Sequence, residues 1–220
     1  MIRTCINSIG VLLAFTIAAC NQRASDTSAN ATSQNTAEQE VNWIPLFNHE
    51  NLEGWQVLPG GEWSVEDGVI IGKSPVEEPL HGILLSDSTY DDFKLKVVYK
   101  AIKGNSGVYF RVEKVEGSDS VNGLQAEIDP DKDAGGLYDT GGRNWVVQPT
   151  PKDVEKWYKP NEWNEMEIVC KGRDVTVFVN GFKTADLKND PGRVSGYIGL
   201  QLHGGMDMEV RFKDILIAEN

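Results

Sequence analysis

Carboxylates and an amide recur at every second position of residues 124–131, which read LQAEIDPD. In a β-strand successive side chains point to opposite faces, so Gln125, Glu127 and Asp129 would share one face and the apolar residues the other. Carboxylates on one face can act as general acids or bases, and an amide beside them can bind hydroxyl groups. The spacing therefore indicates either a site or a solvated strand face.

Two other alternating stretches carry a polar face of similar composition. These faces are formed by Asn105, Tyr109 and Arg111 in residues 104–113, and by Gln201 and His203 in residues 196–205. If the three strands are neighbours, an imidazole, a guanidinium and a phenol join the carboxylates in one patch. In the alternative interpretation each face is solvated and the acids only pair with Arg111. Aromatic residues crowd the segment after Asp129, which favours a sugar site, because sugars bind between planar polar groups and aromatic faces.

Strands are the elements that must position these side chains. Apolar residues alternate in many short runs, such as 174–181, which ends in an Asn180-Gly181 pair typical of a hairpin turn. Helical periodicity is weak, and we expect one short helix within 151–159. Residues 130–164 lack alternation but are rich in Gly, Asp, Pro and Trp, so we expect ordered loops that border one end or face of the fold. Many short strands separated by turns predict an all-β sandwich or jelly roll.

The composition restricts the size of the fold and its partners. The chain has 220 residues, of which 40% are hydrophobic, and a formal net charge of −12. Nucleic acids and anionic membrane surfaces require a basic patch, so the charge argues against both as partners. Because no repeat or change of composition follows residue 41, residues 41–220 are predicted to form a single domain.

The first 40 residues indicate export and anchoring. Residues 1–19 combine Arg3 with an apolar run, and Ile17-Ala18-Ala19-Cys20 resembles the bacterial lipobox, which implies cleavage before Cys20 and its lipidation. A plain signal peptide that contains a cysteine is the alternative, and the apolar run is short of the roughly 20 residues that a membrane span needs. Residues 20–40 are almost free of apolar side chains and predict a flexible tether. The expected location is the bacterial cell envelope, on the periplasmic face or the outer-membrane surface, with the lipid as the only membrane contact.

A series of motifs, taken in order, resembles the 3-keto-disaccharide hydrolase domain, a family common in exported bacterial proteins. The motifs are WIPLFNHENLEGW, GEWSVEDGVIIG, GNSGVYFR, LQAEIDPD, GGLYD, NEWNEMEIVCKGRDVTVFVNG and GYIGLQLHGGMDMEVRFKDI. NSGVYFR and GLQLHG are the most specific, and the resemblance covers nearly all of residues 43–217. It implies a concanavalin A-like jelly roll of two antiparallel sheets, with long loops bordering a concave polar face that binds the ligand.

The family's substrates are glycosides already oxidised at C3, so the resemblance implies a sugar 3-dehydrogenase as the pathway partner. The ketone acidifies the hydrogen on C2, so a base can remove it and the C1 substituent can leave by β-elimination, with water adding afterwards. Such an enzyme needs a base near C2, an electrophile on the C3 oxygen and help for the leaving group. We expect Glu127 or His203 to be the base, Arg111 or a divalent cation to stabilise the enolate, and Asp129 to orient the imidazole or bind the metal.

The other polar residues near this face are candidates for binding sugar hydroxyls. They are Asn105, Tyr109, Gln125, Tyr138, Arg143 and Gln201. Glu127, Asp129 and His203 form a candidate site for Ca²⁺, Mn²⁺ or Zn²⁺, although their spacing matches no zinc motif, and no organic cofactor is expected. His81 is interpreted as a structural residue that could border the cleft.

Two other functions fit the same residues. The sequence Glu127-Ile128-Asp129-Pro130-Asp131 is close to the Glu-Ile-Asp-x-Glu strand of laminarinase-type retaining glycosidases, in which Glu127 and Asp131 would be the catalytic pair. Pro130 tends to end a strand, so this pair could miss the required separation of about 5–5.5 Å. The other candidate is a non-catalytic carbohydrate-binding lipoprotein. Sugar release from an unoxidised β-glucan would favour the glycosidase, and glycan binding without turnover would favour the binding protein.

Overall fold

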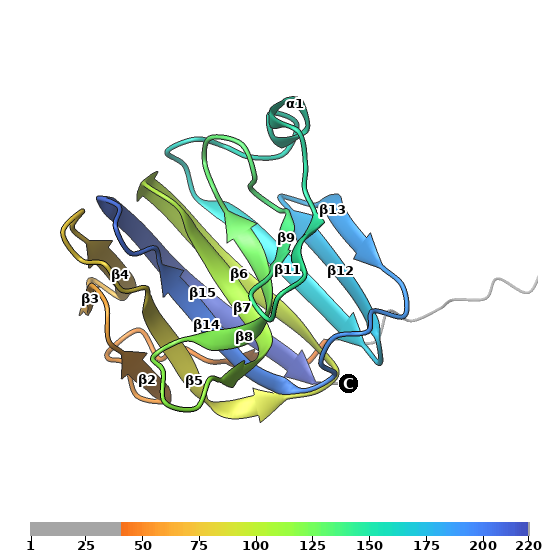
Figure 1. Ribbon diagram of the computed structural model, residues 1–220, viewed down its shortest axis with the longest axis horizontal. Coiled ribbons are helices and arrows are strands. Elements are labelled where there is room, and N and C mark those ends of the chain that lie inside the picture. The colour runs from red at the N-terminus through yellow and green to blue at the C-terminus, as the bar shows by residue number, and fades with distance from the viewer. Residues whose placement is uncertain (1–40, 220) are drawn as a thin grey trace, which may run out of the picture. The chain divides into compact units, whose positions relative to one another are not determined.

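The computed structural model describes residues 41–219, which form two antiparallel β-sheets packed face to face (Figure 1). The predicted leader, the lipidated Cys20 and the tether lie outside the described residues. Within residues 41–219 no helix is long and apolar enough to cross a membrane.

The first sheet lies away from the candidate site. Its strands are β1 (Ile44–Pro45), β3 (Glu62–Glu66), β4 (Val69–Ser74), β6 (Phe93–Lys103), β11 (Asn164–Lys171), β12 (Asp174–Val179), β13 (Phe182–Leu187) and β15 (Met208–Glu219). They are arranged in the order β13-β12-β11-β6-β15-β4-β3, and β1 pairs with β15.

The second sheet carries the candidate site. Its strands are β2 (Trp55–Leu58), β5 (Gly82–Tyr90), β7 (Ser106–Lys114), β8 (Val121–Ile128), β9 (Leu137–Asp139), β10 (Asn144–Val147) and β14 (Gly196–Leu202). Their order is β10-β9-β8-β7-β14-β5-β2. The three stretches singled out in the sequence therefore become neighbouring strands, in the order β8, β7 and β14.

The core fills the space between the sheets and follows the predicted alternation. On β6 every second residue, from Phe93 to Tyr99, is fully buried, while the residues between them are partly exposed. From the second sheet, Phe110 and Ile128 point into the same core. Burial of such side chains contributes about 1.5–3 kcal/mol each, which makes the alternating pattern the main determinant of the fold. The predicted jelly-roll sandwich is confirmed.

Residues 130–164 contain more regular structure than expected. The short strands β9 and β10 extend the second sheet, and α1 (Pro151–Val154) forms only the first turn of the predicted helix, with a capping box between Thr150 and Asp153. Helix α1 lies at one end of the sandwich (Figure 1). The indole of Trp157 donates to the carbonyl of Ala134 (2.9 Å), which ties the segment after α1 to the loop between β8 and β9. Strands of three or four residues are too short to show alternation, so the sequence did not reveal them.

Candidate functional site

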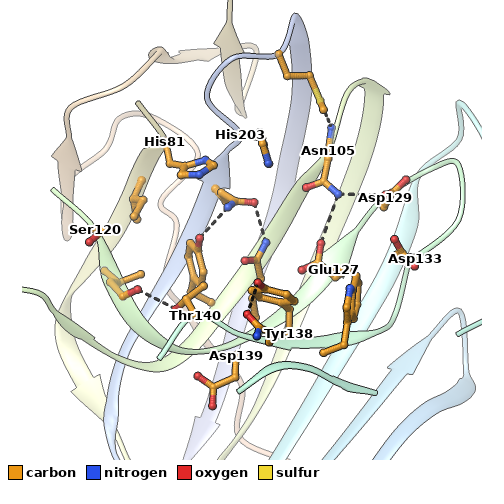
Figure 2. A pocket seen from close by; sticks show the side chains of 18 of the residues that line it. His81, Asn105, Ser120, Glu127, Asp129, Asp133, Tyr138, Asp139, Thr140 and His203 are labelled. Carbon is orange, nitrogen blue, oxygen red and sulfur yellow. Dashed lines mark hydrogen bonds between the residues drawn. The ribbon is translucent and has the colours of Figure 1, made fainter. Parts of the chain in front are cut away.

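Polar side chains from five strands (β7, β8, β9, β10 and β14) and from the adjoining loops line one cleft on the face of the second sheet that is turned away from the core (Figure 2). The cleft has a volume of about 700 Å³, which is within the range of small-molecule sites. Of the residues selected from the sequence, the cleft is lined by Asn105, Tyr109, Gln125, Glu127, Asp129, Asp131, Tyr138, Gln201 and His203.

Strand register explains why these residues meet. Gln125 pairs with Tyr109 on one side and with Tyr138 on the other, and Tyr138 pairs in turn with Trp145. Two residues along β8, Glu127 pairs with Gly107, so it points to the same face as Gln125. Asn105, Asp129, His203 and His81 lie directly beyond the ends of β7, β8, β14 and β5.

Gly107 opens the sheet surface for an amide network. A Cβ atom at this position would lie 2.0 Å from Nε2 of Gln125, because the Gln125 side chain folds over the glycine. There Gln125 Nε2 donates to Oε1 of Gln201 (2.7 Å), and Gln201 Nε2 donates to the hydroxyl of Tyr109 (2.8 Å). Since the Tyr109 oxygen accepts this bond, its hydroxyl hydrogen can be donated to a ligand.

Glu127 is a buried carboxyl group in the middle of the cleft, with 6% of its surface exposed. Burial raises the pKa of Glu127 to about 8; the hydrogen bond from Asn105 opposes this shift, and the nearby carboxylates of Asp129 and Asp133 add to it. Asn105 Nδ2 lies 3.4 Å from Oε2 of Glu127 and 3.2 Å from Oδ2 of Asp129, so one amide bridges the two acids. At neutral pH Glu127 is therefore mainly protonated and can serve as a general acid.

Asp129 ends strand β8 and turns the chain. Its Oδ1 accepts from the backbone N–H groups of Asp131 (2.9 Å) and Lys132 (3.3 Å). The strand stops at Ile128, and Asp131 lies in the following turn with its side chain exposed. The retaining-glycosidase alternative requires Glu127 and Asp131 to lie on one continuous strand, and the structure does not place them so. The Asp129 carboxylate holds Asn105 and this turn, which differs from the predicted role of orienting the imidazole.

Asp133 is a buried acid that sequence reasoning missed, with 4% of its surface exposed. Gln148 Nε2 donates to it (3.2 Å), and Lys132 Nζ lies 3.6 Å from its other oxygen. Its position in the turn after β8 gave no alternation from which to recognise it.

Two imidazoles form one wall of the cleft (Figure 2). The rings of His81 and His203 meet edge to face, with centroids 4.6 Å apart. Partial burial lowers the pKa of His81, and the neighbouring His203 lowers it further, against the opposing effect of the Leu202 carbonyl. His81 therefore favours the neutral ring. From the sequence it was interpreted as a structural residue that could border the cleft, and it was not selected as a site residue.

Two aromatic side chains lie on the side of Glu127 that is opposite to His81 and His203. Tyr138 on β9 and Trp145 on β10 meet edge to face, with ring centroids 5.4 Å apart. The Tyr138 hydroxyl donates to Oδ1 of Asn144 (2.9 Å). These faces can stack on a sugar ring. Trp145 and Asn144 belong to the aromatic-rich segment but were not named as binding residues.

Arg111 is not in the cleft, which corrects its prediction as the enolate-stabilising cation. Its Nε and Nη2 donate to the carbonyl of Asp91 (2.9 and 2.6 Å), and its Nη1 donates to the carbonyl of Gly172 (2.7 Å). The ladder between β7 and β8 shifts register between Phe110 and Glu113, and Arg111 has a φ of 52°. Such a bulge moves the following side chains to the other face. Arg111 is thus a buried structural residue, 2% exposed.

Arg143 also lies outside the cleft, contrary to its prediction as a sugar-binding residue. Its guanidinium pairs with Asp139 and, through Nη1 (2.7 Å) and Nη2 (3.2 Å), with Asp190. These two buried carboxylates raise the pKa of Arg143 through its hydrogen bonds, chiefly that to Asp190. The side chain therefore braces the loop after β9 against the loop before β14.

The predicted metal ligands do not converge. Among residues 41–219, no group of three His, Cys, Asp or Glu side chains is close enough to hold a metal ion. Glu127 and Asp129 both accept hydrogen bonds from the side-chain amide of Asn105, whereas Nδ1 of His203 is hydrogen-bonded to the carbonyl of Gly204 (2.8 Å). The set Glu127, Asp129 and His203 does not fit a metal site in this arrangement.

The sheet order and the cleft define a galectin-like or concanavalin A-like sandwich with a polar, sugar-sized cleft on one sheet. Solved structures agree: a candidate glycosyl hydrolase from Parabacteroides distasonis is 26% identical, with a TM-score of 0.60 over 81% of this chain and 100% of that one. The carbohydrate-binding module CBM66 from Bacillus subtilis is 18% identical (TM-score 0.60; 76% and 96% covered). A Bacillus subtilis protein of unknown function with a galectin-like fold is 14% identical (TM-score 0.62; 81% and 94% covered). No curated protein matches the sequence.

The family is defined by the sequence itself. Residues 42–218 match the model of the 3-keto-alpha-glucoside-1,2-lyase-like domain. The chain belongs to this family, as the motifs in the sequence indicated.

Proposed function

We propose that this chain cleaves glycosides that carry a ketone at C3, by removing the C2 proton and expelling the substituent at C1. The observation that carries the proposal is the position of Glu127, a buried protonated carboxyl group between two imidazoles on one side and two aromatic rings on the other. Membership of the lyase-like family supports the substrate class.

The strand order sets how a substrate would lie. From β14 to β10 the order is β14-β7-β8-β9-β10, and adjacent strands are about 4.8 Å apart, so the cleft crosses about 19 Å of sheet. The oxidised ring would lie near His81 and His203, the glycosidic oxygen over Glu127 on β8, and the departing group against Tyr138 and Trp145. The negative charge of the chain suits such a neutral ligand.

The reaction needs two proton transfers, and the cleft supplies a group for each. Nε2 of His203 takes the proton from C2, and the electrons of the C–H bond form an enolate with the C3 ketone. When the ketone re-forms, the C1–O bond breaks, a C1=C2 double bond remains, and Glu127 donates its proton to the departing oxygen. The products are an unsaturated 3-keto sugar and an alcohol, and later addition of water would give the products of hydrolysis.

Cleavage of two 3-keto-glucosides tests this assignment, one with a methyl and one with a 4-nitrophenyl leaving group. Glu127→Gln is expected to slow methanol release by about 10²–10⁴-fold, because an amide cannot transfer the proton. It should slow nitrophenol release far less, since that group leaves without protonation. Glu113→Gln is the matched control, because Glu113 is an exposed acid paired with Arg193 outside the cleft. Equal, near-normal rates for both substrates in Glu127→Gln would remove Glu127 from the mechanism.

The pH dependence follows from the same carboxyl group. Because the protonated form of Glu127 is the active one, kcat/KM for the methyl glycoside should fall as the pH rises through about 8, the pKa of Glu127. The nitrophenyl substrate should lack this falling limb. A rate that instead rises through pH 8 would identify Glu127 as the base.

A second candidate is binding without cleavage. It is favoured by the Tyr138–Trp145 pair and by the similarity to the CBM66 fold. Isothermal titration with unoxidised disaccharides distinguishes the two functions: binding of these sugars, together with no turnover of either 3-keto-glucoside, would support a binding protein.

We also propose that the protein is lipid-anchored at Cys20 in the bacterial envelope and receives its substrate from a sugar 3-dehydrogenase. The lipobox-like sequence and the polar residues up to 40 support the anchor. Cys20→Ser should release the protein from the membrane fraction, and mass spectrometry of the native N-terminus should show acyl chains.

A further inference from the structure

Gly204 hydrogen-bonds both imidazoles of the cleft through its own backbone. Its N–H donates to Nδ1 of His81 (3.0 Å), and its carbonyl lies 2.8 Å from Nδ1 of His203. An N–H group can only donate and a carbonyl can only accept, so Nδ1 carries a hydrogen in His203 and none in His81. In their neutral forms the two rings therefore differ at Nε2, which carries a lone pair in His203 and is an N–H donor in His81.

The position of Gly204 against the preceding loop maintains this arrangement. A Cβ atom on Gly204 would lie 2.5 Å from the carbonyl oxygen of Pro79 and 2.6 Å from the carbonyl carbon and oxygen of Leu80. These are backbone atoms of the segment that leads into β5, so they cannot turn aside as a side chain would. Only glycine at position 204 allows the backbone to come this close to Pro79 and Leu80, and this close packing positions the Gly204 N–H for its hydrogen bond to Nδ1 of His81.

We infer that His81 is a catalytic residue that donates its Nε2–H to the C3 ketone oxygen of the substrate while His203 removes the C2 proton. The inference rests on the proposed function and adds to it the electrophile that Arg111 does not supply. Both rings line the cleft and their centroids are 4.6 Å apart, so one donor and one acceptor lie close enough together to serve the adjacent C2–H and C3=O groups.

A neutral imidazole is suited to donating a hydrogen bond to the ketone oxygen rather than to transferring a proton as a general acid. When the C–H bond breaks, negative charge develops on the ketone oxygen, and the His81 N–H stabilises it by a hydrogen bond without giving up the proton. A neutral ring is too weak an acid to protonate the leaving group, which is the task assigned to Glu127. Lys132, a cation that also lines the cleft, lies beyond the end of β8 beside Asp133. A neutral histidine that polarises a carbonyl is an established catalytic device.

Hydrogen exchange isolates the first step of the reaction. The probe is 1,5-anhydroglucitol oxidised at C3, which has the ketone and the C2 hydrogen but no leaving group. In D₂O, nuclear magnetic resonance follows replacement of the C2 hydrogen by deuterium, and cleavage of methyl 3-keto-glucoside is measured in parallel. The variants are His81→Ala, His81→Gln and Glu127→Gln, with His49→Ala as the control, because His49 lies outside the cleft.

His81→Ala is expected to slow exchange and cleavage by the same factor, about 10²–10³, mainly in kcat, as the loss of one preorganised donor would. His81→Gln, whose amide N–H can reach a position near that of Nε2, should recover part of both rates. Glu127→Gln should retain exchange and lose cleavage, and His49→Ala should retain both. Melting temperatures confirm that each variant is folded.

The outcomes separate the inference from the function on which it rests. If the unmodified protein exchanges and cleaves while His81→Ala keeps its exchange rate, His81 is not the electrophile and the proposed function stands. If exchange is lost in Glu127→Gln instead, Glu127 is the base and the assignment to the histidine pair is wrong. If the unmodified protein neither exchanges nor cleaves, both the proposed function and this inference are refuted.

Discussion

Replacing Glu127 by Gln should stabilise the protein in alkaline solution and leave its stability nearly unchanged in acid. The carboxyl group has an ordinary pKa of 4.5 and a pKa of about 8 in the folded protein. Between these values the folded state holds a proton that the unfolded state has released. The free energy of unfolding therefore decreases as the pH rises from 4.5 to 8. Glutamine has nearly the same shape and never ionises, so the variant escapes this loss.

The size of the effect follows from the distance between the two pKa values. Each pH unit between them corresponds to about 1.4 kcal/mol, so above pH 8 the buried charge costs about 3–5 kcal/mol. For a domain of this size the difference corresponds to roughly 10 °C in melting temperature. Below pH 4.5 both side chains are neutral in both states, and the two proteins should differ by less than about 1 kcal/mol.

Urea unfolding at pH 5, 7 and 9 measures the effect directly. The difference in unfolding free energy between Glu127→Gln and the unmodified protein should increase with pH, whereas Glu113→Gln should give a difference that does not increase with pH. A Glu127→Gln difference that is the same at pH 5 and pH 9 would mean that Glu127 ionises normally in the folded state. Its assignment as the general acid at neutral pH would then fail as well.

Three other variants test the structural arguments. Arg111→Met should lower the free energy of unfolding by about 1.5–3 kcal/mol, because the carbonyl groups of Asp91 and Gly172 lose their charged hydrogen-bond donor; normal urea stability would contradict the structural role. Gly107→Ala must displace the Gln125 side chain from Gln201, so we expect KM for the 3-keto-glucoside to rise about tenfold with little change in melting temperature. Trp145→Ala should raise KM about tenfold for a 3-keto-disaccharide but not for the methyl glycoside, and equal effects on both would exclude stacking on the departing sugar.

Alternation alone was sufficient to predict the sandwich and most of one polar face. Gln125 and Glu127 project from β8 as expected, and Gln201 projects from β14 toward the same cleft. These residues lie within uninterrupted strands, where the period of two fixes the face of every side chain. The types of side chain on this face could therefore be predicted from the sequence alone.

Residues at interruptions of the strands were not predictable in this way. Arg111 lies in the bulge between Phe110 and Glu113, and the irregularity is enough to turn its side chain from the cleft to the interior. The neighbouring strands do carry a mark of this bulge: a Cβ on Gly196 would lie 2.4 Å from the carbonyl oxygen of Val112, and one on Gly123 would lie 3.1 Å from that of Arg111. Glycines on both sides of an alternating strand are thus a sequence feature that could have predicted the shift.

The glycines of the site are required for a different physical reason from those of the turns. Asn180 and Gly181 have φ values of 50° and 80°, which the hairpin between β12 and β13 requires. Gly107 and Gly204 are not among the residues with positive φ, so any residue could adopt their backbone conformation. Their lack of a side chain matters only because Gln125 and the loop at Pro79 and Leu80 lie against them. Neither contact is needed to form the sandwich, whereas both bring polar groups together in the cleft, so these two positions are determined by the site rather than by the fold.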